Sequence, residues 1–210
     1  MSYIRCGGGA EDGGLPTFTE TVIATGTSGG TVTFTGDYHD YDFVVLRCTN
    51  ESTSDITDLL TTPDMLDAIF SANNNTIVVN EFQNNQYGNY DKTSATVWTR
   101  TASRNLYISK VTGLVCDNYT VTETEVYNRG SYGTSSVTIT GTGFLDYDLL
   151  VIASSVDGIQ PNSLSISKPV GTDDFYPLLV TPYNRYDRVK VTDTEMSSAP
   201  YHYVSGIKFV

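Results

Sequence analysis

Residues 31–48, T-V-T-F-T-G-D-Y-H-D-Y-D-F-V-V-L-R-C, are matched later in the chain by residues 136–153, S-V-T-I-T-G-T-G-F-L-D-Y-D-L-L-V-I-A. Both stretches contain a V-T-[FI]-T-G segment and an Asp-Tyr-Asp triplet that leads into four apolar residues. The central tyrosines of the triplets, Tyr41 and Tyr147, are separated by 106 residues. Because self-similarity is the sequence signature of a repeated structural unit, this pair of stretches predicts an internal duplication.

Two further blocks of similarity follow in the same order. Residues 87–92 (Y-G-N-Y-D-K) match residues 183–188 (Y-N-R-Y-D-R), and residues 107–109 match residues 203–205, both at a separation of 96 residues. The fall in separation from 106 to 96 predicts ten extra residues in the first copy, between the first block and the second. Chance similarity among strands rich in Thr and Tyr is the competing explanation.

The apolar runs 43–46 (F-V-V-L) and 149–152 (L-L-V-I) are predicted to form inner strands. Every position in them is apolar, as in a strand that is covered on both faces, whereas residues 31–35 alternate between polar and apolar. The abundance of Thr, Tyr, Val and Gly favours strands over helices. We therefore predict an all-β fold of two tandem β-sandwich modules of jelly-roll or immunoglobulin-like type, covering residues 19–116 and 117–210.

One helix is predicted, in the inserted region of the first module. Thr62 can cap its N-terminus, Pro63 suits the first helical position, and Asp64 falls in the positive first turn. Apolar residues follow at helical spacing: Met65, Leu66, Ile69 and Phe70. The pattern predicts a short helix over residues 63–70 that has no counterpart in the second module.

Residues 1–18 are predicted to form a glycine-rich N-terminal arm. Five glycines lie between Gly7 and Gly14, and they give this segment a high backbone entropy when it is unfolded. Its apolar side chains are Tyr3, Ile4, Leu15 and Phe18. The segment is either a disordered terminus or an arm that becomes ordered on a neighbouring subunit. We expect the second, with a symmetric assembly as the result.

The charge of the chain excludes one class of partner. The 210 residues include 24 acidic and 12 basic side chains, a formal net charge of −12, so a nucleic-acid backbone would be repelled. The sequence contains no apolar stretch near the roughly 18 residues that span a bilayer, and its N-terminus lacks a signal-peptide profile. We therefore expect no nucleic-acid partner and no membrane association, and we expect the chain to fold in a cytoplasm.

Candidate catalytic and metal-binding residues are few. Cys6, Cys48 and Cys116 have neither disulfide-framework nor zinc-ligand spacing, and Cys48 is expected to be a small buried residue. His39 and His202 are the two histidines, and the sequence contains no recognised nucleophile, zinc or phosphate-binding motif. We expect no enzymatic activity and no cofactor.

The acidic triplets offer a second interpretation, as calcium ligands. Asp37, Asp40 and Asp42 lie close together, and Asp146 and Asp148 recur in the second copy. The spacing lacks the glycine and terminal glutamate of a compact calcium loop. We therefore expect these carboxylates to cap turns or face solvent, and we predict no metal site.

The 15 tyrosines provide candidate binding residues. Exposed aromatic rings beside Asn and Gln are typical of sugar-binding or protein-binding surfaces. Tyr90 and Tyr186 recur at matching places, which favours a role in the core. Tyr87, Trp98 and Tyr183 are the candidates for a ligand-binding surface.

The features quoted above, from the V-T-[FI]-T-G segments and the Asp-Tyr-Asp-apolar runs to the acidic charge and the glycine-rich arm, resemble small structural proteins of tailed bacteriophages. The resemblance covers the whole chain and transfers no functional residues. It implies a non-enzymatic tail, baseplate or head-decoration subunit, made in the host cytoplasm, that assembles with itself and with other virion proteins. The alternative is a carbohydrate-binding module or adhesin whose loop tyrosines bind a host-surface glycan.

Overall fold

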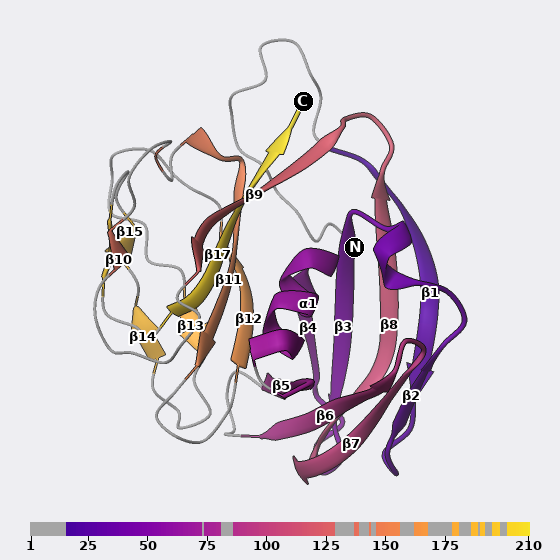
Figure 1. Cartoon of the computed structure of the whole chain (residues 1–210). Coiled ribbons are helices and arrows are strands. Elements are labelled where there is room, and N and C mark those ends of the chain that lie inside the picture. Colours follow the sequence, from indigo (N-terminus) through magenta and orange to yellow (C-terminus); the bar gives the residue numbers. More distant parts are fainter. Residues whose placement is uncertain are drawn as a thin grey trace.

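The protein is described from a computed structural model. The described residues are 16–72, 74–80, 86–128, 137–138, 143, 146–155, 162–167, 178–180, 186–188, 190–191, 195–197 and 201–210. Strands dominate this part of the chain, so the predicted all-β class is confirmed (Figure 1).

The elements follow one another in this order: β1 (Phe18–Gly26), β2 (Thr31–Phe34), the 3-10 helix η1 (Tyr38–Asp40), β3 (Phe43–Asn50), β4 (Ile56–Thr61), α1 (Pro63–Ala72), β5 (Thr76–Asn80), β6 (Tyr87–Ser94), β7 (Val97–Arg104), β8 (Leu106–Cys116), β9 (Val121–Asn128), β10 (Val137–Thr138), β11 (Leu149–Ser155), β12 (Asn162–Ser167), β13 (Leu178–Val180), β14 (Tyr186–Arg188), β15 (Lys190–Val191), β16 (Glu195–Ser197) and β17 (Tyr201–Phe209).

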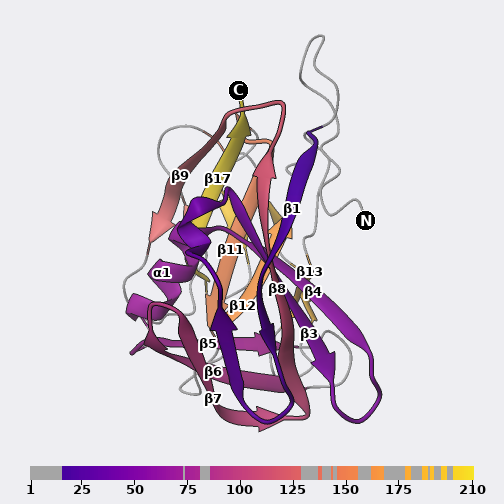
Figure 2. The ribbon, with the colours of Figure 1, turned by 90° about the vertical axis from the view of Figure 1, so that its right-hand side faces the viewer.

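The first half of the chain forms one antiparallel sheet of eight strands in the order β4-β3-β8-β1-β2-β7-β6-β5. This sheet curls nearly into a barrel, so that β5, β6 and β7 run across the direction of β3 and β8 (Figure 2). The first half therefore differs from the expected sandwich of two stacked sheets. Its core is enclosed by one continuous curled sheet.

Glycine permits the close strand approaches at the start of β8. A Cβ atom on Gly26 of β1 would lie 2.1 Å from the carbonyl oxygen of Ile108, and one on Gly88 of β6 would lie 2.5 Å from that of Leu106. Real Cβ atoms do not come so close to a backbone oxygen. The absence of a side chain at these two positions lets β1 and β6 approach the same end of β8, so that the curled sheet brings β6 back to β8.

A second sheet of four strands has the order β12-β11-β17-β9, which corresponds strand for strand to β4-β3-β8-β1. The registers also correspond. Phe43 is paired with Leu114 in the first sheet and Leu149 with Ile207 in the second, and the β-bulge after Arg47 has its equivalent after Ala153. The apolar runs 43–46 and 149–152 thus lie at matching inner positions of the two sheets.

The pairing of β8 and β17 with the inner strands changes the alignment of the last matched block, residues 107–109 with 203–205. With Leu114 and Ile207 equivalent, β8 and β17 are separated by 93 residues, and Tyr203 corresponds to Lys110 instead of Tyr107. The separation is still 106 at Thr61 of β4 and Ser167 of β12. The first half therefore has 13 more residues between these strands, where ten were expected, and they fall after β4.

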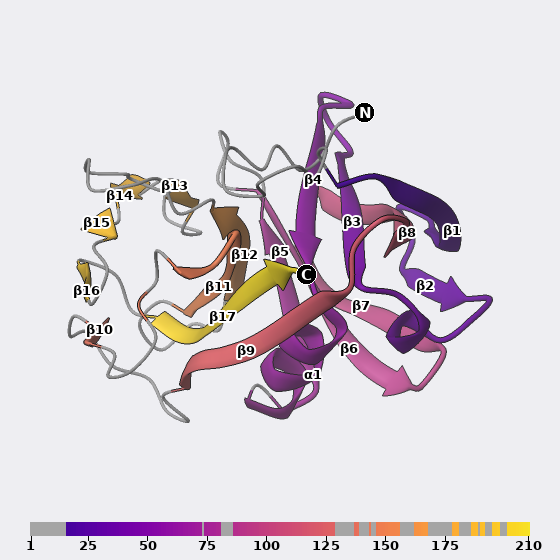
Figure 3. The same ribbon diagram turned by 90° about the horizontal axis from the view of Figure 1, so that it is seen from above.

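The predicted helix is confirmed as α1, and it lies between the two sheets (Figure 3). The Thr62 hydroxyl accepts a hydrogen bond from the Met65 amide at 3.2 Å, as an N-cap does. All four predicted apolar residues of α1 are buried. An equivalent helix in the second half would fall within residues 168–177, which lie outside the described part of the chain. The predicted lack of a counterpart therefore stays a prediction.

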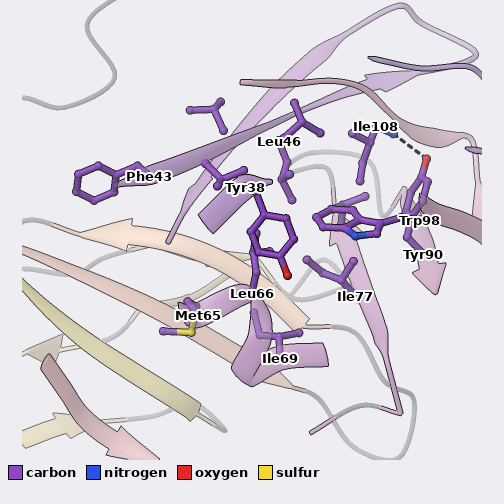
Figure 4. Packing of buried hydrophobic residues seen from close by; sticks show 14 of the residues in the cluster. Tyr38, Phe43, Leu46, Met65, Leu66, Ile69, Ile77, Tyr90, Trp98 and Ile108 are labelled. Atoms are coloured by element: carbon purple, nitrogen blue, oxygen red, sulfur yellow. Dashed lines mark hydrogen bonds between the residues drawn. The ribbon is translucent and has the colours of Figure 1, made fainter. Parts of the chain in front are cut away.

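One hydrophobic core extends through both halves. Its largest fully buried side chains belong to the first half and include Trp98, Tyr38, Tyr90 and Phe43 (Figure 4). Leu149, Val151 and Ile207 of the second sheet belong to the same cluster, and α1 contacts β11 and β17. Cys48 is fully buried, as expected.

The beginning of the described chain is part of the folded body. Phe18 opens β1, and its ring lies 5.9 Å from that of Phe43 and 6.2 Å from that of Phe209. Thr17 is hydrogen-bonded to Asn118. Thr17 and Phe18 therefore belong to the folded body although they were expected in the arm, and the arm stays a prediction for residues 1–15, which lie outside the described part. Among the described residues, none belongs to a helix that is long and apolar enough to cross a membrane.

Candidate functional site

The tyrosines of the two Asp-Tyr-Asp triplets lie against glycines of neighbouring strands. A Cβ atom added to Gly113 of β8 would lie 2.4 Å from ring atoms of Tyr41, and one added to Gly206 of β17 would lie 2.4 Å from the ring of Tyr147. The two glycines occupy equivalent positions, since each precedes the residue that pairs with the start of the inner strand. Each triplet therefore uses its tyrosine to cover a glycine in the sheet.

The last aspartate of each triplet supports the end of the same neighbouring strand. The Asp42 amide donates to the carbonyl of Leu114 at 2.9 Å, and its carboxylate accepts from the Cys116 amide at 2.8 Å. Asp148 makes the equivalent bonds, to the Ile207 carbonyl at 2.8 Å and from the Phe209 amide at 2.9 Å. The carboxylate of Asp42 or Asp148 thus replaces a backbone carbonyl as the acceptor for a strand-end amide, next to the start of the inner strand.

The triplets therefore have a structural role in this protein. Two of their three side chains are occupied by contacts with the sheet, and a glycine in β8 or β17 completes each unit. No group of three or more His, Cys, Asp or Glu side chains suited to a metal ion is found in the described ranges. The expectation that these carboxylates cap turns fits Asp37, which caps η1, and Asp146, which accepts from the Gly143 amide. Asp42 and Asp148 instead accept from strand-end amides.

A polar cluster joins η1 to α1 and β6, and we refer to it as the His39 cluster: Asp37, Tyr38, His39, Asp67 and Lys92. Asp37 caps η1 by accepting from the His39 amide at 3.0 Å. The His39 ring places Nδ1 2.6 Å from Asp37 Oδ1 and Nε2 2.8 Å from Asp67 Oδ2. One imidazole thus bridges two carboxylates from different elements.

Tyr38 and Lys92 form the buried side of the His39 cluster. The Tyr38 hydroxyl donates to Asp67 Oδ1 at 2.5 Å, and Lys92 Nζ donates to the Tyr38 hydroxyl at 2.6 Å and to Asp67 Oδ1 at 3.2 Å. The Lys92 ammonium also lies over the rings of Tyr38 and Phe70. Burial and the neighbouring Asp67 raise the pKa of Tyr38 well above its ordinary value.

The carboxylates and the imidazole of the His39 cluster stabilise each other's charged forms. Burial disfavours the charged form of Asp67, but hydrogen bonds from Tyr38, His39 and Lys92 lower its pKa overall. Burial alone would lower the pKa of His39, yet hydrogen bonds to Asp67 and Asp37 raise it overall. The cluster therefore favours a positive imidazolium between two negative carboxylates.

The aromatic candidates do not form one surface. Trp98 is fully buried, and its ring lies 4.7 Å from that of Phe34 and 5.0 Å from that of Phe70. The expectation that Trp98 contributes to a ligand-binding surface is therefore wrong, because its ring packs inside the curled sheet. Tyr87 is half-buried at the start of β6, and Tyr183 lies outside the described residues.

Tyr90 has the core role that its repetition suggested. It is buried, and its hydroxyl accepts a hydrogen bond from the Ile108 amide at 2.8 Å. Burial raises the pKa of Tyr90 to about 12. The side chain of Tyr186 lies outside the described part, so its expected core role stays a prediction.

A small pocket of about 110 Å³ lies between α1 and the second sheet, lined by Asp64, Met65, Ala68, Glu123, Glu125, Tyr203 and Ser205. Glu123 of β9 accepts a hydrogen bond from the Thr62 hydroxyl at 2.9 Å, which links the N-cap of α1 to the second sheet. Burial raises the pKa of Glu123, although hydrogen bonds with Ser205 and Thr62 oppose the shift.

No sequence pattern indicated the His39 cluster. Lys92 and Asp67 are distant from His39 along the chain, and only the packing of α1 and β6 against η1 brings them together. The local signal available was the Asp37-x-His39 spacing, which suits an aspartate that caps a short turn.

The comparisons with known proteins add no functional assignment. The chain matches no protein-family model, no curated protein and no solved structure.

Proposed function

We propose that this protein is a non-enzymatic structural protein of a bacteriophage virion. It acts as one subunit of a homo-oligomeric tail, baseplate or head-associated assembly, and its partners are further copies of itself and other virion proteins. The proposal rests on the sequence resemblance and on the way the fold uses its polar residues.

The observation that carries the proposal is the structural use of the repeated motif. In both triplets the tyrosine covers a glycine and the last aspartate accepts from a strand-end amide. A repeated residue set is a natural candidate for a functional site, yet here it supports two sheets. A chain whose most distinctive side chains reinforce its strands suits a scaffold better than a catalyst.

The same correspondence supports a proposal about origin. We propose that β1, β3, β4 and β8 and their counterparts β9, β11, β12 and β17 derive from one duplicated module, so that residues 19–116 and 117–210 are two copies of it. Matching strand order, matching registers and bulges at equivalent positions support this proposal.

The decisive experiment for the assembly proposal is mass photometry of the purified full-length chain, repeated over a range of concentrations. We expect a closed oligomer of defined mass. A matched deletion of residues 1–15, which leaves Phe18 and its aromatic contacts intact, tests the role of the arm. We expect this variant to keep its strand content by circular dichroism and to lose or weaken the oligomer.

Two outcomes would contradict the proposal in different ways. A full-length chain that stays monomeric at all concentrations, alone and with other proteins of the same particle, would exclude an assembly subunit. If the deletion left the oligomer unchanged, the protein would still be an assembly subunit, but residues 1–15 would have no part in its assembly.

A further inference from the structure

The His39 ring has carboxylate oxygens at hydrogen-bond distance from both of its nitrogens. Nδ1 lies 2.6 Å from Asp37 Oδ1, and Nε2 lies 2.8 Å from Asp67 Oδ2. An ionised carboxylate can only accept hydrogen bonds, and a neutral imidazole has one N–H and one acceptor nitrogen. Both bonds exist together only when both ring nitrogens carry a proton.

Loss of that proton has a defined structural consequence. A neutral His39 would direct a nitrogen lone pair at either Asp37 or Asp67, and two acceptors at 2.6 or 2.8 Å repel one another. One of the two contacts must then open. Because the His39 side chain is 42% exposed, water can reach the ring and its proton can exchange with solvent.

We propose that His39 is a pH-dependent latch, which as an imidazolium holds the Asp37 and Asp67 carboxylates together and releases one of them when it loses its proton. The fixed side of the latch is Asp67, because Tyr38 of η1 and Lys92 hold it independently, so η1 stays attached to α1 in both states. The movable side is Asp37, whose side chain is 62% exposed and also caps η1. The latch therefore acts on the N-cap of the turn that leads directly into the first Asp-Tyr-Asp triplet.

The charged groups around His39 come from three elements. Asp37 and Asp40 belong to its own turn, Asp67 belongs to α1, and Lys92 of β6 lies on the far side of Asp67. Three carboxylates against one ammonium leave the surroundings negative, which favours the imidazolium. The raised pKa of His39 agrees with this balance.

The direction of the pH dependence follows from proton binding. A histidine whose pKa is raised on folding contributes stability that is fully present below its unfolded value of about 6.5 and is lost as the pH rises through the folded value. The latch is therefore closed in mildly acidic solution and open in alkaline solution. Each unit by which the pKa is raised corresponds to about a tenfold change in the opening equilibrium.

Nitrogen-15 NMR of the histidine rings in the full-length chain tests the proposal directly. The His39 signals are assigned as those that disappear in His39→Gln. At pH 6 we expect both ring nitrogens of His39 to be protonated, with a titration midpoint above 6.5. A neutral His39 ring at pH 6, or a midpoint at or below that reference value, would overturn the proposal.

Amide hydrogen exchange over residues 37–40 tests the structural consequence. After correction for the intrinsic pH dependence, we expect faster opening at pH 8.5 than at pH 6, by about tenfold for each unit of the measured midpoint shift. The matched control is Asp37→Asn, which keeps the size of the side chain and removes one carboxylate, and we expect it to lower the His39 midpoint. Equal opening at both pH values would show that His39 binds a proton without acting as a latch.

Discussion

At the scale of single residues, the stability of the sheets depends on glycines that lie beneath aromatic rings. Tyr41 and Tyr147 occupy the space that a side chain at position 113 or 206 would need, and each tyrosine lies two residues before an inner strand. Aromatic cover of a glycine stabilises a sheet at a position where no side chain can pack.

Gly113→Ala is expected to lower the free energy of unfolding by about 1–3 kcal/mol, because the new methyl group would lie within 2.4 Å of the Tyr41 ring. Urea unfolding followed by circular dichroism measures the change. Gly36→Ala is the control, since a Cβ atom there has no neighbour within 4 Å. An equal response of the two variants would show that the ring moves aside without cost.

Tyr90→Phe is expected to destabilise the protein by about 1–3 kcal/mol, because the Ile108 amide would lose its acceptor inside the core. Tyr41→Phe is the control, since it removes a hydroxyl and keeps the ring over Gly113. Chemical denaturation measures both. A Tyr90→Phe variant as stable as the control would mean that water or another group satisfies this amide.

At the scale of elements, α1 connects the two halves. Its buried face fills the curled first sheet, Thr62 at its N-cap donates to Glu123 of β9, and Asp67 in its middle belongs to the His39 cluster. The helix is thus held at two points by titratable groups whose pKa values are shifted for different reasons.

Glu123→Gln is expected to leave stability unchanged or raise it at pH 7 to 8. The folded state disfavours the Glu123 carboxylate and raises its pKa, so the native protein binds the proton more tightly than the unfolded chain. Stability from this group therefore falls as the pH rises above about 4.5. The amide keeps an acceptor for Thr62 without the buried charge.

The pH dependence of the thermal midpoint measures this effect. We expect the difference between the variant and the original chain to favour the variant increasingly as the pH rises from 4 to the folded pKa of Glu123, and to stay constant above it. A Glu123→Gln protein that is less stable at pH 8 would show that the charge at this position contributes more through its hydrogen bonds than its burial costs.

At the scale of the whole molecule, the two halves share one core. Phe18 and Phe43 of the first sheet contact Phe209 of the second, and α1 contacts strands of both sheets. The two halves resemble each other in topology, and their buried apolar side chains belong to one cluster. Shared burial of this kind couples the unfolding of both parts.

We therefore expect a single cooperative unfolding transition. Trp98 is the one tryptophan of the chain and lies in the first half, so its fluorescence reports on that half, whereas far-ultraviolet circular dichroism reports on strands of both. The two signals should give the same urea midpoint. Separate midpoints would mean that the halves unfold independently and that their contacts are weak.

The sequence was informative where a residue pattern has a local physical cause. The runs of apolar residues located the inner strands, and the Thr62-Pro63 signal with helical apolar spacing located α1. The repeated triplet also identified strands with matching places in two sheets. The last matched block lay three residues out of register, because a match of three residues is too short to fix the alignment of two strands.

The sequence by itself determined the all-β class, the helix and one inner strand of each sheet, since these depend on hydrophobic patterning and capping within a few residues. Only the tertiary structure decided that the first sheet curls into one near-barrel, that Trp98 is in the core, and that His39 joins Asp37 to Asp67. These features arise from contacts between residues distant in the chain. Such contacts depend on how glycines let strands approach and on which side chains then face each other, and no local pattern records either.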